Sequence, residues 1–127
     1  MTEQEFKRRT KRFALRVIRL VESLPNSKTA SVIGYQLLKT GTSVGANYRA
    51  ACRGKSTKDV IAKLGIVEEE ADESLFWVEL VVEAELVPEK RLADLMEEGN
   101  EILAMTVASI KTLRKRRRKQ PNPKSKI

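Results

Sequence analysis

The chain has 127 residues, which suits one domain around a single core, and its wealth of Leu, Ala, Val, Glu, Lys and Arg favours an all-helical protein. Its net charge of +8 is uneven: residues 1–20 carry seven Lys/Arg against two Glu, residues 111–127 carry nine against none, and the middle carries nine against fifteen Asp/Glu. Histidine is absent and cysteine occurs once, which excludes Glu-x-x-His di-iron sites, His-activated nucleophiles and thiolate zinc sites in their usual forms.

The first two predicted helices are defined by apolar or small residues at intervals of three and four. The first carries its stripe at Phe6, Thr10, Phe13, Val17, Leu20 and Leu24 and ends before Pro25-Asn26. Asn26 or Ser27 is expected to cap the second helix, and Gly54 to stop it. The stripe of this second helix is Ala30, Ile33, Leu37, Gly41, Val44, Tyr48 and Ala51.

Two further helices are predicted after the glycine. Ser56 and Asp59 have the spacing of a capping box and open the longest predicted helix, with its stripe at Ile61, Leu64, Val67, Ala71, Leu75, Val78 and Val82. Pro88 suits the first turn of the fourth, whose stripe is Leu92, Leu95, Gly99, Ile102, Thr106, Ile110 and Leu113. Since short connections make successive helices antiparallel, we predict an all-α, up-down-up-down four-helix bundle over residues 1–118. Residues 119–127, with Pro121 and Pro123, are expected to form a disordered basic tail.

The third predicted helix carries a second apolar stripe. It consists of Ile66, Phe76, Trp77, Leu80, Ala84 and Val87. Because a bundle helix needs one apolar face, we expect part of this surface to be buried between subunits. The alternative is a wide core face in a monomer.

Three patterns in the sequence resemble chemical sites. Gly54-Lys55-Ser56-Thr57 imitates the end of a P-loop, but that motif needs a glycine where Arg49 stands, so we interpret it as a helix-helix turn. Cys52 is interpreted as a small core residue. Glu69 and Glu73 share a helical face, which allows a carboxylate metal site, although a solvated face with one or two interhelical partners is favoured.

Pairing of the second and third helices about residues 54–55 would bring residues 41–43 opposite residues 68–70. Thr42 or Ser43 is then expected to donate to Glu69, and Asn47 or Arg49 to meet another carboxylate. The small residues Gly41 and Gly45 would let another helix approach closely.

Residues 34–80 resemble a family of small bacterial four-helix-bundle proteins first noted as open reading frames within intervening sequences of 23S ribosomal RNA genes. The resemblance rests on Gly41-Thr-Ser-Val-Gly-Ala-Asn-Tyr-Arg-Ala50, on Lys63-Leu64, and on Glu69-Glu-Ala-Asp-Glu-Ser74 followed by Trp77. It implies a left-handed antiparallel bundle, often a ring-like homopentamer. It also implies a relation to the accessory protein of diversity-generating retroelements, which binds a reverse transcriptase and its template RNA. No catalytic residue is established for the family. The motif residues, with a structural or interface role, are Gly41, Thr42, Ser43, Gly45, Asn47, Tyr48, Arg49, Glu69, Asp72, Glu73 and Trp77.

The two basic ends indicate a polyanionic partner, because clustered Lys/Arg release counterions from phosphates. We expect a non-enzymatic, oligomeric bundle that binds nucleic acid, RNA rather than DNA, by charge and shape. The candidate contacts are Lys7, Arg8, Arg9, Lys11, Arg12, Arg16, Arg114, Lys115, Arg116, Arg117, Arg118 and Lys119. Antiparallel packing would bring both clusters to one pole.

Two alternatives remain open. The chain is an adaptor that binds a reverse transcriptase together with template RNA, or its charges only keep it in solution. No cofactor or metal is expected. The chain shows no apolar run suited to a membrane span or a signal peptide, so a cytoplasmic location without a membrane partner is expected.

Overall fold

Short hydroxyl side chains cap three of the helices in the computed structural model, which describes residues 1–119. The helices are α1 (Glu3–Glu22), α2 (Lys28–Ala51), α3 (Thr57–Glu83) and α4 (Glu89–Lys119). The hydroxyls of Thr2, Ser27 and Ser56 accept hydrogen bonds from backbone N–H groups in the first turns of α1, α2 and α3. These bonds confirm Ser56 as a cap, and they select Ser27 over Asn26 for α2.

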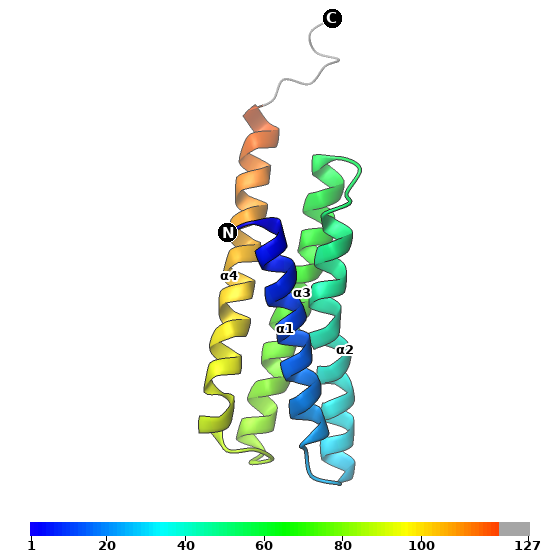
Figure 1. Cartoon of the computed structure of the whole chain (residues 1–127), viewed down its shortest axis with the longest axis vertical. Coiled ribbons are helices and arrows are strands. Elements are labelled where there is room, and N and C mark those ends of the chain that lie inside the picture. Colours follow the sequence, from blue (N-terminus) through cyan, green and yellow to red (C-terminus); the bar gives the residue numbers. More distant parts are fainter. Residues whose placement is uncertain (120–127) are drawn as a thin grey trace, which may run out of the picture.

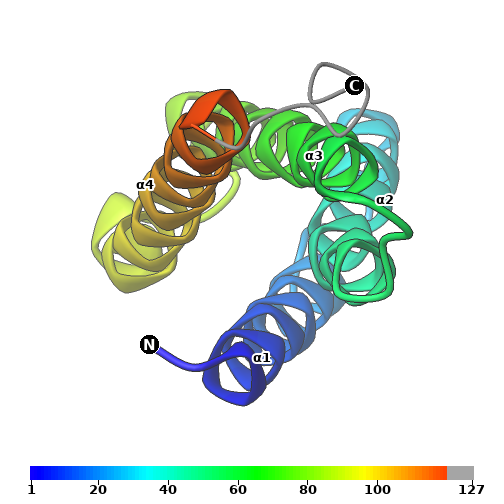
Figure 2. The same ribbon diagram turned by 90° about the horizontal axis from the view of Figure 1, so that it is seen from above.

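Successive helices run in opposite directions, which confirms the all-α, up-down-up-down bundle (Figure 1). Seen from above, α2 and α3 form the middle of an arc, with α1 beside α2 and α4 beside α3 (Figure 2). Contact between α1 and α4 is sparse. Lys119, the first residue of the predicted tail, is the last residue of α4, and residues 120–127 lie outside the described part of the chain.

The predicted stripes form the core of the bundle. Phe13, Leu37 and Ile102, one each from α1, α2 and α4, are among the largest fully buried side chains. Departures from the stripes occur mostly toward the helix ends: Leu24, Tyr48, Ile61 and Leu113 are half-buried, and Val81 is buried in place of Val82.

The small residues of α2 allow close approach by α1, as predicted. A Cβ added to Gly41 would lie 2.8 Å from Val17, and one added to Gly45 would lie 3.3 Å from the hydroxyl of Thr10. Glycine at these two positions therefore allows the close contact between α1 and α2.

α2 ends at Ala51, shortly before Gly54, as predicted. The backbone there is not left-handed, since no glycine in residues 1–119 has positive φ; the missing side chain of Gly54 instead makes room for Val60. The prediction of the longest helix is wrong. The longest helix is α4 with 31 residues rather than α3 with 27, because its helical structure continues beyond its apolar stripe.

Glu69 is not the partner of the polar residues of α2. Thr42 and Ser43 donate to carbonyl groups of their own helix, at 2.7 Å and 2.6 Å, and Glu69 is exposed. The buried polar contact between the two helices is instead the hydrogen bond from the Ser74 hydroxyl to that of Thr40, at 3.0 Å. It lies one helical turn away from the expected register.

The second stripe of α3 is divided. Val87 is buried, Trp77 and Leu80 pack at the edge of the core, and Ile66 and Phe76 are 41% and 50% exposed. Part of the stripe therefore widens the core of the single chain, and part of it lies on the surface.

Candidate nucleic-acid interface

The first basic cluster lies along the outer face of α1. A shallow groove of about 540 Å³ is lined there by Arg8, Lys11, Arg12, Leu15, Arg16 and Arg19, with no acidic residue in the lining. Near Arg16 and Arg19, a second hollow also includes Arg91 of α4. Sequence reasoning missed Arg19, although it lies three residues after Arg16 and so shares its face. It missed Arg91 because this residue belongs to α4, and only the packing of the helices places it near Arg16 and Arg19.

Arg9 does not belong to this outer face. Its guanidinium donates to both carboxylate oxygens of Glu98, at 2.8 Å and 2.6 Å, and to Glu101 at 2.9 Å. The hydrogen bonds from Arg9 hold the pKa of Glu98 below its usual value. Arg9 therefore joins α1 to α4 and is engaged within the protein, whereas Lys7 makes only a loose pair with Glu3, at 3.9 Å.

The second basic cluster projects from the end of α4. Lys111 and the predicted residues from Arg114 to Lys119 are all exposed, and α4 extends past the start of α1 (Figure 1). Arg9 lies beside Glu98, so Arg116 is eighteen residues, or about 27 Å, further along the axis. From the contact between Arg9 and Glu98, the basic face of α1 continues away from the C-terminal end of α4. The two basic clusters therefore do not converge at one pole.

The family-motif residues do not form one site. Gly41 and Gly45 face α1, Thr42, Ser43 and Asn47 donate to carbonyl groups of α2, and Arg49, Glu69 and Asp72 are exposed. Glu73 accepts a hydrogen bond from the Trp77 ring nitrogen at 3.1 Å. Tyr48 packs edge-on against Phe6, with ring centroids 4.5 Å apart. Gly41, Gly45 and Tyr48 therefore serve packing between helices, whereas Arg49, Glu69 and Asp72 lie on the surface.

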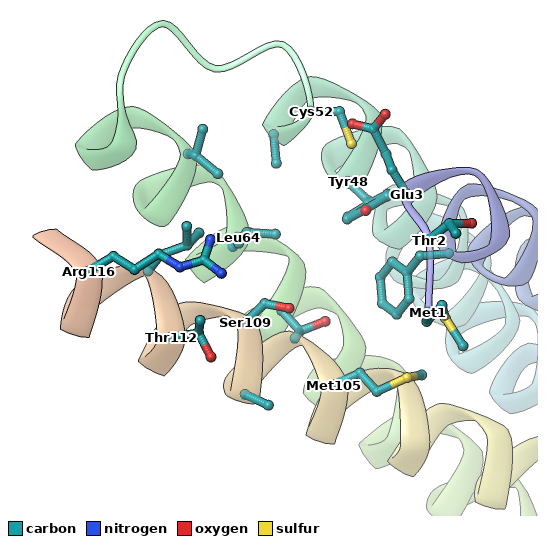
Figure 3. Close-up of a pocket in the computed structure, with 16 residues that line it drawn as sticks. Met1, Thr2, Glu3, Tyr48, Cys52, Leu64, Met105, Ser109, Thr112 and Arg116 are labelled. Carbon is teal, nitrogen blue, oxygen red and sulfur yellow. The ribbon is translucent and has the colours of Figure 1, made fainter.

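A pocket of about 690 Å³ opens where α4 extends beyond α1. Phe6, Val60 and Leu64 give it apolar walls, and Ser109 and Thr112 of α4 add hydroxyls. Arg116 and Glu3 face it from opposite sides (Figure 3). We call this the end pocket. The sequence could not predict it, because it depends on the offset between the two outer helices.

Cys52 and Tyr48 lie on the Glu3 side of the end pocket (Figure 3). Burial, and then the neighbouring Glu3 carboxylate, raise the pKa of the Cys52 thiol, and burial raises the pKa of Tyr48 as well. Both groups are therefore protonated at neutral pH. Cys52 is half-buried at the pocket rather than packed in the core, which corrects its interpretation as a core residue.

Residues 1–119 were compared with the geometry of metal clusters and of membrane-spanning helices. No cluster of three His, Cys, Asp or Glu side chains in that range is placed to hold a metal ion. None of the described helices has the length and apolar character needed to cross a membrane.

These features define a small antiparallel bundle with a basic outer face, a basic projecting helix end and one end pocket. The chain belongs to the family described as 23S rRNA-intervening sequence protein, whose model matches residues 2–108. It is similar to a crystal structure of a protein of unknown function from the S23 ribosomal protein family of Bacteroides thetaiotaomicron. The TM-score is 0.81 and the identity 32%, over 87% of this chain and 99% of that one. The comparison with curated proteins finds no match.

Proposed function

We propose that this chain is a non-enzymatic, cytoplasmic protein that binds RNA through its phosphate backbone. The observation that supports the proposal is the groove on α1, where five cationic side chains gather without an acidic neighbour in the lining. The exposed cations at the end of α4 add a second contact region. Such clusters attract phosphates and release their counterions on binding. RNA is favoured over DNA because the family description refers to a ribosomal RNA intervening sequence.

The test is a binding titration of single-stranded RNA and duplex DNA over a salt series. A variant with Arg8, Lys11, Arg12 and Arg19 changed to Gln is expected to bind more weakly and to show a flatter dependence of log affinity on log salt. The matched control changes four exposed lysines outside the basic clusters to Gln, namely Lys28, Lys55, Lys58 and Lys90. Both variants lose the same charge, so equal effects, or no binding by the unchanged protein at low salt, would contradict the proposal.

We also propose that the protein assembles as a homo-oligomer, a pentamer by its family resemblance. The exposed part of the second stripe, Ile66 and Phe76, supports this, because large apolar side chains gain free energy when a neighbouring subunit covers them. Sedimentation of the unchanged protein and of Phe76→Ser tests the assembly. A monomer at all concentrations would contradict it.

A second candidate function is that of an adaptor, which holds a protein such as a reverse transcriptase together with its template RNA. Val32 and Tyr35 favour it, since they are 56% and 64% exposed on α2, outside the second stripe. Under this function, RNA binds tightly only when the protein partner is present. Full RNA affinity of the isolated bundle would reject it.

A further inference from the structure

The end pocket is built for a ligand with two unlike ends. The Arg116 guanidinium points into it from one side, and the Glu3 carboxylate lies at the other side, next to Cys52 (Figure 3). A guanidinium pairs with anions such as phosphate, whereas a carboxylate accepts hydrogen bonds and repels anions. A ligand that fits therefore presents its anion toward Arg116 and its hydrogen-bond donors toward Glu3.

The walls between the two ends suit a flat ring. The half-buried Tyr48 contributes aromatic surface, and the largely buried Phe6 and Leu64 lie behind it as apolar walls. The hydroxyls of Ser109 and Thr112 can each donate or accept along the edge of such a ring. Unpaired RNA bases are recognised in this way, by stacking on aromatic side chains and by hydrogen bonds along their edges.

The position and size of the pocket agree with this class of ligand. Arg116 belongs both to the pocket and to the exposed basic cluster of α4, so a strand held by that cluster passes the pocket mouth. The volume of about 690 Å³ is within the range of sites for small ligands. The groove on α1 offers no comparable place, since Leu15 is the only apolar residue in its lining.

We infer that the end pocket receives one unpaired nucleotide of a bound RNA strand, with its phosphate at Arg116 and its base directed toward Glu3. The inference rests on the proposed function, because the strand must be held by the cations of α4. Guanine, adenine and cytosine carry an exocyclic amino group that can donate to Glu3. Uracil offers one ring N–H between two carbonyl oxygens, which a carboxylate repels. The pocket therefore selects against uracil.

The test titrates the full-length protein with guanosine monophosphate and with uridine monophosphate, and it follows methyl resonances by NMR. Leu64 and Leu113 report on the pocket, while Val87 and Leu92, near the other end of the bundle, serve as the reference. We expect shifts at the pocket methyl groups only, and affinity for the uridine nucleotide about tenfold weaker, or about 1.4 kcal/mol. Glu3→Gln is expected to remove most of this preference.

A variant whose end pocket is filled by a larger side chain tests this inference separately from the proposed function. Ser109→Trp adds bulk inside the pocket, and Ala104→Trp adds the same bulk at an exposed position of α4 outside it. Loss of nucleotide binding in Ser109→Trp alone, with the salt dependence of RNA binding retained, supports the inference. Nucleotide binding that survives Ser109→Trp, or equal affinity for the two nucleotides, overturns the inference and leaves phosphate binding intact. Nucleotide binding without any RNA binding overturns both.

Discussion

Val17 of α1 occupies the space that a side chain on Gly41 of α2 would need. An ideal Cβ at Gly41 would lie 2.8 Å from both Cγ atoms of Val17, closer than carbon atoms pack in proteins. This contact holds α1 against α2. It thereby fixes which face of α1 turns outward, and that outward face carries the basic groove.

Gly41→Ala is expected to cost about 1–3 kcal/mol in overpacking, because Val17 is fully buried and cannot move away without repacking. After the gain of about 1 kcal/mol in helix propensity, we expect a net loss of stability of up to about 2 kcal/mol. Gly65→Ala is the matched control, since a Cβ there meets nothing within 4 Å, and it should leave the stability unchanged or raise it. Chemical denaturation measures both variants. Equal stabilisation of the two would show that the contact with Val17 is not tight.

Glu98→Gln is expected to lower the stability by about 1.5–3 kcal/mol at neutral pH, since it removes the charged hydrogen bonds from Arg9. The pKa of Glu98 is lowered in the folded protein, so its stabilisation is complete above the unfolded value of about 4.3. It is lost as the pH falls through the lower folded pKa, because both states are then protonated. Unfolding measured across this range should show the two proteins converging in acid. Glu97→Gln, at the exposed neighbouring position, is the control, and a pH-independent difference for Glu98→Gln would contradict the assignment.

Glu85→Gly is expected to stabilise the protein by about 1 kcal/mol. Glu85 follows the end of α3 with φ of 58°, a left-handed conformation that glycine adopts without steric cost. The N–H of Leu86 donates to the carbonyl of Val81 at 3.0 Å, which is the backbone bond of a glycine-type helix end. Glu83→Gly, inside the last turn of α3, is the control and should destabilise. If thermal unfolding shows that both variants are destabilised, the left-handed conformation is not retained in solution.

The sequence predicted features that depend on neighbours along the chain. The stripe of α1 from Phe6 to Leu20 and the cap at Ser56 follow from spacing alone, and the structure confirms them. The contact between Thr40 and Ser74 could not be predicted, because a single turn of difference in helix register changes which residues meet. The ion pair between Arg9 and Glu98 likewise depends on the relative position of α1 and α4 along their axes, which the sequence does not specify.

Ending the chain at Leu113 tests the projecting part of α4. The deletion removes residues 114–127, which carry eight Lys/Arg, while the described residues after Leu113 are exposed and outside the core. We therefore expect the free energy of unfolding to change by less than about 0.5 kcal/mol. The slope of log affinity for single-stranded RNA against log salt is expected to flatten by about 0.7 for each phosphate that the shortened protein no longer neutralises.

The same deletion also removes Arg116 from the end pocket. The affinity for guanosine and for uridine monophosphate is therefore expected to fall together with the salt slope, because Arg116 contacts the phosphate that both nucleotides carry. The variant with Gln at Arg8, Lys11, Arg12 and Arg19 is the comparison, because it removes cations from α1 and leaves the end pocket complete. If the shortened chain keeps the slope of the unchanged protein, α4 makes no phosphate contact and RNA binding belongs to α1 alone. If its slope flattens but its affinity for both nucleotides is unchanged, Arg116 does not hold the nucleotide.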